Sequence, residues 1–230
     1  MTLQRSEAYA TTAGVPAPPG AAARRRLAGV PAPVLRDLRD RSGHSPRSLV
    51  FAAGDVVVVS GLPGSGKSTL IRRAAGGRGI DSQDTRDRWE ARMPKLLPYA
   101  VYRPLVRIAH YAGLRRALRS GESVVVHDCG TQAWVRRWLA REARRRGRGL
   151  HLVLLDITPA VAREGQRERG RGVSGYAFAR HRRAVGRLVG DAEAGRLPAG
   201  CASAVLLDRD SAGVLCRVGF EESKAGPSGD

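Results

Sequence analysis

One stretch decides the fold of this chain, and it reads Gly61-Leu62-Pro63-Gly64-Ser65-Gly66-Lys67-Ser68-Thr69. The stretch fits the pattern G-x-x-x-x-G-K-[ST], in which the glycines let backbone N–H groups converge on phosphate oxygens. A helix that starts here would point the positive end of its dipole at the same place. Lys67 can reach the β- and γ-phosphates of a nucleotide, and the Ser68 hydroxyl can ligate Mg²⁺. These nine residues therefore predict a nucleotide-binding loop.

The sequence on either side of the loop supplies the structural context that the pattern requires. Residues 55–60 (Asp-Val-Val-Val-Val-Ser) are typical of a short parallel strand buried on both faces. Residues 69–75 predict a helix that ends at Gly76-Gly77. Strand, glycine loop and helix together favour a true phosphate site over a chance glycine-rich turn.

Length and composition fit one globular domain with tails. The chain has 230 residues, of which 42% are hydrophobic, enough for one α/β domain with a real core. Its three cysteines are odd in number and lack metal-binding spacing, which suits reduced thiols. No apolar run approaches the length of a membrane span, and the first residues lack the apolar core of a signal peptide. We therefore expect a cytoplasmic protein.

The formal net charge of +19 comes almost wholly from arginine, since lysine occurs only at positions 67, 95 and 224. Arginine is well suited to bidentate phosphate contacts, so the charge is compatible with nucleic acid or another polyanion as a partner. The alternative is a coding bias that leaves arginines covering solvated helix faces. The arginines are spread along almost every predicted helix, which favours the second interpretation.

Strands and helices alternate along the rest of the chain. Strands are expected at 55–60, near 80, at 123–128, at 150–156 and at 204–208, and helices lie between them. This alternation predicts a three-layer α/β/α P-loop NTPase fold with a mostly parallel sheet of roughly five strands. We assign residues 1–30 to a disordered basic arm, 31–220 to the domain and 221–230 to a disordered tail.

Three local expectations are less regular. Residues 33–41 could form a short helix, and a short strand near residue 80 should run into a polar loop that extends to residue 88. Pro94, Pro98 and Pro104 should prevent a long helix from running through that part of the chain. From Pro104 onward a helix is expected to carry its apolar face on Leu105, Ile108, Ala109 and Ala112.

In parallel sheets of this kind the ligand lies beyond the carboxyl ends of the strands. That rule brings the loop at 61–69 together with Asp81, Asp84, Asp128 and the segment 163–175. Asp128 ends an apolar strand, which favours it as the carboxylate that holds Mg²⁺ or its water. Asp156 also follows a strand and competes for this role, although it leads directly into the Thr158-Pro159 helix start.

Two further groups of residues could contribute to catalysis. Asp81 or Asp84 could activate an acceptor hydroxyl or assist the metal, and Arg86 and Arg88 could bind an acidic acceptor. Four arginines flank a glycine-bearing loop, and some of them could neutralise charge during transfer: Arg163, Arg167, Arg169 and Arg171. The histidines at 127, 151 and 181 share no metal spacing and are expected to be structural.

The order of these motifs resembles that of the P-loop kinases of the polynucleotide kinase and zeta-toxin type. The chain is most similar to the small AAA-domain ATP-binding proteins grouped with them, over roughly residues 55 to 210. This resemblance implies that Lys67 and Ser68 bind ATP·Mg²⁺. It also implies that Asp128 is the family's strand-end aspartate and that Arg169 is a lid arginine.

The sequence therefore favours an ATP-binding protein of kinase type that transfers the γ-phosphoryl group to an unidentified acceptor, with Mg²⁺ and without a membrane. An ATPase that acts as a conformational switch is the second hypothesis. A nucleic-acid-binding P-loop protein that uses its arginine surface is the third.

Overall fold

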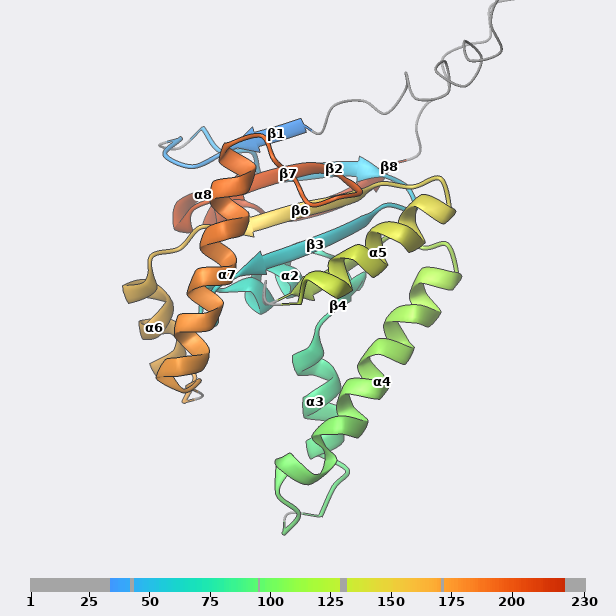
Figure 1. Ribbon diagram of the computed structural model, residues 1–230, viewed down its shortest axis with the longest axis vertical. Helices are drawn as coiled ribbons and strands as arrows, with labels where there is room; N and C mark the ends of the chain where they lie inside the picture. Colours follow the sequence, from blue (N-terminus) through green and yellow to red (C-terminus); the bar gives the residue numbers. More distant parts are fainter. Residues whose placement is uncertain (1–33, 42–43, 95, 129–131, 171, 222–230) are drawn as a thin grey trace, which may run out of the picture. The chain divides into compact units, whose positions relative to one another are not determined.

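The computed structural model describes residues 34–41, 44–94, 96–128, 132–170 and 172–221. The predicted arm at 1–30, the tail beyond Glu221, Arg171 and the segment 129–131 lie outside these residues. The described part has a six-stranded sheet in which every pair of neighbours is parallel (Figure 1). In spatial order the strands are β1 (Val34–Asp37), β7 (Cys201–Leu207), β6 (Leu150–Leu155), β3 (Val56–Gly61), β5 (Val124–Asp128) and β4 (Gly79–Ile80). The prediction of an α/β P-loop NTPase fold is confirmed.

The central strand β3 leads into the phosphate-loop sequence. It lies between β5 and β6, and each of its six residues is buried. Successive side chains of a strand point to opposite faces, so Val56 and Val58 enter one core and Val57 and Val59 enter the other. A continuous valine run is the pattern that a strand covered on both faces requires.

Helices on one face of the sheet pack onto Val56, Val58 and their neighbours. Leu114, Leu139 and Phe178 belong to this core and come from three different helices. The helices that contribute to it are α4 (Tyr99–Arg119), α5 (Ala133–Arg145), α6 (Pro159–Arg167) and α7 (Gly175–Glu193). The start of α6 is as predicted, because Thr158 Oγ1 accepts a hydrogen bond from Val161 N and Pro159 follows it.

The opposite face is covered by shorter elements. Helix α2 (Lys67–Ala74) contributes Leu70 and Ile71 to the second core. A separate two-stranded parallel ladder of β2 (Ser48–Ala52) and β8 (Arg217–Glu221) adds Leu49 and Val218 to the same core, and the short helix α8 (Arg209–Val214) precedes β8. The sequence patterns had not indicated this ladder.

Two expected elements have a different secondary structure. The helix expected at 33–41 is wrong, because Val34–Asp37 is strand β1, paired in register with residues 203–206 of β7. The backbone of β7, which would be the edge of the sheet without β1, supplies hydrogen-bond partners that override a weak helical pattern. The polar loop expected after residue 80 is also wrong, since Ser82–Glu90 forms helix α3.

The predicted start and packing face of α4 are wrong too. The helix begins at Tyr99, with Pro98 as its N-cap, and it contains Pro104 near its start. Its buried line includes Val106, Leu114 and Leu118, whereas Leu105 is 50% exposed and Ile108 is 65% exposed. A helix with apolar residues on two sides can bury only one, and packing onto the sheet selects the Val106 side.

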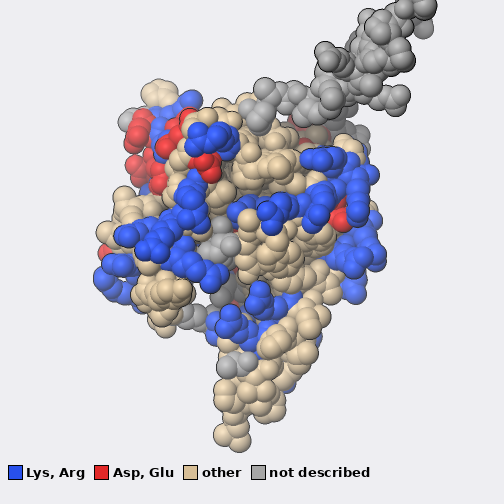
Figure 2. Space-filling model, in the orientation of Figure 1, with Lys and Arg blue, Asp and Glu red and all other residues tan. Residues whose placement is uncertain are grey.

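None of the described helices combines the length and the apolar character that a membrane crossing needs. Arginine and lysine side chains spread across the face shown in Figure 2, with fewer acidic residues among them. This distribution agrees with arginines that cover several helices.

Candidate nucleotide-binding site

The loop between β3 and α2 has the backbone that its glycines predict. Gly64 has a φ of 89° and Gly66 a φ of 90°, and Gly66 is the N-cap of α2. These values lie in the left-handed region that favours glycine. A Cβ on Gly64 would lie 1.9 Å from the carbonyl oxygen of Ala162 in α6. The loop and α6 therefore touch at a point where any side chain would separate them.

Lys67 lies at the mouth of the loop. Its Nζ donates to the carbonyl oxygens of Gly61 at 2.8 Å and Leu62 at 2.6 Å. Lys67 is 4% exposed and Ser68 8% exposed. The Ser65 hydroxyl is buried and has no hydrogen-bond partner among the described residues. The loop thus concentrates donors around a small space, as an anion site needs.

A cleft of about 660 Å³, which we call the main cleft, opens beside this loop. It is bordered by side chains that come from five parts of the chain and include Lys67, Ser68, Arg86, His127, Gln166 and Arg169. The topology explains the meeting point. The chain leaves β3 for β4, returns to β5 beside β3, and then crosses to β6 on the other side, and ligands bind where connections diverge in this way.

The segment after α6 is tied to the loop by Gln166. Its Nε2 donates to the carbonyl oxygen of Pro63 at 2.9 Å, and its Oε1 accepts from Val173 N at 3.0 Å. Arg169 borders the 660 Å³ cleft. Arg163 instead lies over the ring of Phe178, 4.9 Å from its centroid. Among the described candidate lid arginines, Arg169 is the one that faces the phosphate loop.

A second hollow of about 230 Å³ lies on the other side of the loop. It shares Gly64, Gly66 and Arg169 with the main cleft and extends to Thr69 and to Arg209 of α8. The phosphate loop therefore has space on both sides: the main cleft towards His127 and the second hollow towards α8.

Asp128, the predicted metal-binding aspartate, stands at the end of β5 opposite Ser60 in register. Arg136 Nη1 of α5 donates to its Oδ2 at 2.7 Å, and both side chains are less than a tenth exposed. The competing Asp156 accepts from Arg39 Nη1 at 2.6 Å. Asp128 and Asp156 thus both have an arginine partner, and a metal contact through Asp128 Oδ2 would compete with a buried ion pair.

Asp81 and His127 form a pair that the sequence did not indicate. His127 Nδ1 lies 3.7 Å from Asp81 Oδ1, and the Asp81 side chain is only 1% exposed. Burial lowers the pKa of His127 to about 4, and the positive charges of Lys67 and Arg169 act in the same direction against the opposing effect of Asp81. His127 is therefore neutral at pH 7, and it borders the cleft.

The predicted residues of α3 lie on two sides of the helix and do not share one cavity. Arg86 borders the main cleft, with its Nε 2.5 Å from Glu90 Oε1 and its guanidinium 4.1 Å from the Tyr99 ring centroid. Asp84 and Arg88 line a different cavity of about 460 Å³ between α3 and α4. Because a helix turns, α3 presents Ser82 and Arg86 to the nucleotide side and Asp84 and Arg88 to the other.

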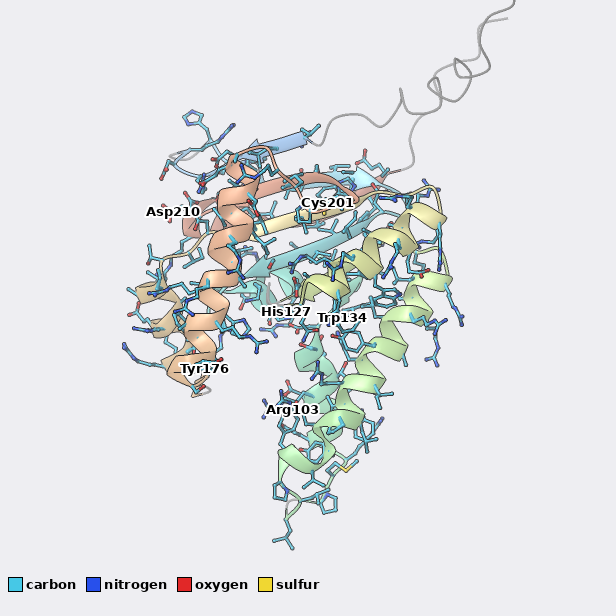
Figure 3. All side chains as sticks on the ribbon, viewed as in Figure 1. Arg103, His127, Trp134, Tyr176, Cys201 and Asp210 are labelled. Carbon is cyan, nitrogen blue, oxygen red and sulfur yellow. The ribbon has the colours of Figure 1, made fainter. Side chains whose placement is uncertain are left out.

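A further cavity of about 290 Å³ adjoins the main cleft and shares Ser82, Arg86 and His127 with it. We call it the side cavity. Tyr99, Arg103 and Arg107 of α4 and Gln132 before α5 also line it. His127 is in β5 and Arg103 is in α4, and both are labelled in Figure 3. Sequence reasoning missed these α4 residues, and the spacing of Tyr99, Arg103 and Arg107 at every fourth position was the signal that could have found them.

Fold and loop together define a P-loop NTPase. The chain belongs to the AAA domain family, whose match covers residues 56–189, more than half of its length. Among the curated proteins none matches the chain.

Three solved structures are similar in fold. The chain is 16% identical to a candidate kinase from Chloroflexus aurantiacus, with 67% of this chain and 84% of that chain covered and a TM-score of 0.45. It is 12% identical to a protein of the PezAT toxin–antitoxin system of Streptococcus pneumoniae, with coverage of 83% and 76% and a TM-score of 0.47. It is 18% identical to the tunicamycin resistance protein of Deinococcus radiodurans, with 55% of this chain and 78% of that chain covered and a TM-score of 0.36.

Proposed function

We propose that the protein binds ATP with Mg²⁺ and transfers the γ-phosphoryl group to the hydroxyl of an acceptor molecule. The observation that carries the proposal is the main cleft itself. It joins the donors of the phosphate loop to a second, adjoining cavity, with Arg86 and His127 on the border between them. A pure ATPase needs space for water beside the γ-phosphate, whereas a kinase needs space for an acceptor.

Phosphoryl transfer depends on positioning and on neutralising charge. In the proposed reaction Lys67 contacts the β- and γ-phosphates, and Arg169 adds positive charge from the other side of the cleft. The bond from the acceptor oxygen to the γ-phosphorus forms, the bond to the β,γ-bridging oxygen breaks, and ADP leaves. The hydroxyl proton passes to water in the cleft, and His127, which borders the cleft, is neutral at pH 7.

The residues present fit Mg²⁺ as an ion held mainly by nucleotide phosphates and water. Ser68 supplies a hydroxyl beside the loop, and no cluster of three or more histidine, cysteine or acidic side chains occurs in the described part of the chain. Mg²⁺ commonly keeps several waters and takes few protein ligands, so this donor set suits it. When bound, the ion neutralises charge on the phosphates.

A transfer assay tests the proposal. The protein is incubated with γ-³²P-ATP, Mg²⁺ and pools of small metabolites or of 5′-hydroxyl oligonucleotides, and both labelled product and ADP are measured. We expect ADP formation that depends on an acceptor, and loss of both signals in Lys67→Ala. ADP release at the same rate without any acceptor would replace the kinase with the ATPase switch.

A further inference from the structure

The side cavity has the composition of a binding site for a small molecule. Its inner surface includes the buried apolar residues Val106, Leu114, Val126 and Val135. Polar groups stand around them: Tyr99, His110, Tyr111 and Gln132, with the Tyr111 hydroxyl donating to Gln132 Oε1 at 2.7 Å. An apolar floor with a few convergent polar groups is the common form of a small-molecule site.

Three arginines face this cavity, and they differ in their partners. Arg86 is paired with Glu90 and lies over the Tyr99 ring. Arg103 and Arg107 stand one turn apart on α4 and make no hydrogen bond or ion pair with any described residue. The two arginines therefore present adjacent positive charges to the side cavity, where one anion can contact both.

The acidic groups that line or adjoin the cavity do not neutralise Arg103 and Arg107. Asp128, which also lines the cavity, is bonded to Arg136, and Asp81 lies beside His127. The two arginines therefore retain their charge for a ligand. Arginine presents donors in a planar fork that suits phosphate and carboxylate groups.

We propose that the acceptor is a small anionic metabolite that carries a phosphate or carboxylate as well as the reacting hydroxyl. This inference rests on the proposed function. Arg103 and Arg107 bind its anionic group, the apolar floor receives its body, and its hydroxyl faces the γ-phosphate past His127 and Arg86. A volume of about 290 Å³ lies just below the usual range for ligand sites, roughly 300–1,000 Å³, which favours a small metabolite over a nucleic-acid strand.

Two matched double variants test whether the effect of Arg103 and Arg107 depends on their position beside the side cavity. Arg103→Gln/Arg107→Gln removes two charges that line the cavity. Arg115→Gln/Arg119→Gln removes two charges from exposed positions of the same helix that border neither the side cavity nor the main cleft. Both doubles change the net charge equally, so a difference between them reports position and not overall electrostatics.

The binding measurement uses inorganic phosphate, titrated by calorimetry into protein saturated with the β,γ-imido analogue of ATP and Mg²⁺. Because the analogue fills the phosphate loop, phosphate reports on a second anion site. We expect saturable binding that weakens about tenfold or more in Arg103→Gln/Arg107→Gln and stays within about twofold in the control double. No saturable binding, or equal binding in the two doubles, would overturn the proposal.

The transfer measurement uses ATP with matched pairs of acceptors: glucose 6-phosphate and glucose, glycerol 3-phosphate and glycerol, AMP and adenosine. A preference for anionic members, with acceptor KM raised in the first double and ATP affinity unchanged, supports the proposal. Transfer to a neutral acceptor or to an oligonucleotide, with equal KM in both doubles, overturns it and leaves the kinase standing. If no acceptor is phosphorylated while inorganic phosphate still binds through Arg103 and Arg107, the proposed kinase activity is wrong and the proposed anion site remains.

Discussion

Gln166 donates a hydrogen bond of 2.9 Å from its side-chain amide to the carbonyl oxygen of Pro63, and so connects the end of α6 to the phosphate loop. The same side chain accepts from Val173 N, on the far side of the glycine-bearing segment. One nearly buried residue therefore holds both the loop that binds phosphate and the segment that carries Arg169.

Replacing Gln166 should loosen both contacts together. In Gln166→Leu the Val173 N–H and the Pro63 carbonyl lose their partner, so we expect faster amide exchange across 160–175 and ATP affinity lowered several-fold. Hydrogen-exchange mass spectrometry and ATP titration measure these effects. Gln132→Leu removes a comparable amide from the side cavity and should leave exchange at 160–175 unchanged. Equal exchange in the two variants would contradict the connecting role.

Gly64 should not tolerate even a methyl group. Gly64→Ala places Cβ against the Ala162 carbonyl and requires a left-handed backbone, which costs about 1–3 kcal/mol before the clash is counted. We expect a lower melting temperature and loss of ATP binding. Gly186→Ala in α7, where a Cβ meets nothing within 4 Å, should instead stabilise by about 0.5–1 kcal/mol. Thermal unfolding of both variants decides, and an unchanged Gly64→Ala protein would refute the close approach.

The Asp128–Arg136 pair should matter for stability whatever else Asp128 does. Arg136→Leu leaves a buried carboxylate unpaired, so we expect a loss of about 3–5 kcal/mol, most of which the double variant Asp128→Leu/Arg136→Leu recovers. On the same helix, Arg145→Leu breaks an exposed pair with Glu142 and should cost less than about 1 kcal/mol. Urea unfolding of the four proteins measures these differences. Similar losses for Arg136→Leu and Arg145→Leu would be inconsistent with the buried pair.

His127 should make stability depend on pH between about 4 and 6.5. Its pKa is lowered to about 4 in the folded chain from an ordinary value of 6.5, so in this window the unfolded state binds more protons. The free energy of unfolding should then rise with pH across the window and fall on acidification. His127→Asn removes this contribution and should show a flatter profile than the unaltered protein. Parallel urea midpoints from pH 4.5 to 7.5 would contradict the lowered pKa.

Much of this architecture can be predicted from residues 55–77, because strand, glycine loop and helix are set by local sequence. The five predicted strands can be recognised because a strand that is buried on both faces is a continuous apolar run in the sequence. Strand β1 could not be predicted, since four residues pair there only because the edge of β7 is available. The local sequence had no means to indicate that partner.

The candidate site also has a part that the sequence predicts and a part that it does not. Lys67 and Ser68 are specified by a motif, so the sequence places them correctly beside the cleft. The roles of Asp81, Asp84 and Asp128 depend on which side of an element each faces and on partners far along the chain, such as Arg136. The side cavity was missed because three prolines suggested a break in the helix that carries Arg103 and Arg107.

The pairing of β2 with β8 sets an order for folding on the ribosome. Roughly 165 residues separate the end of β2 from the start of β8, and β1 likewise waits for β7. At about 5–20 residues per second, translation leaves both early strands without partners for roughly 10–30 s. During synthesis the nascent chain must therefore keep these strands from pairing elsewhere until its final segments emerge.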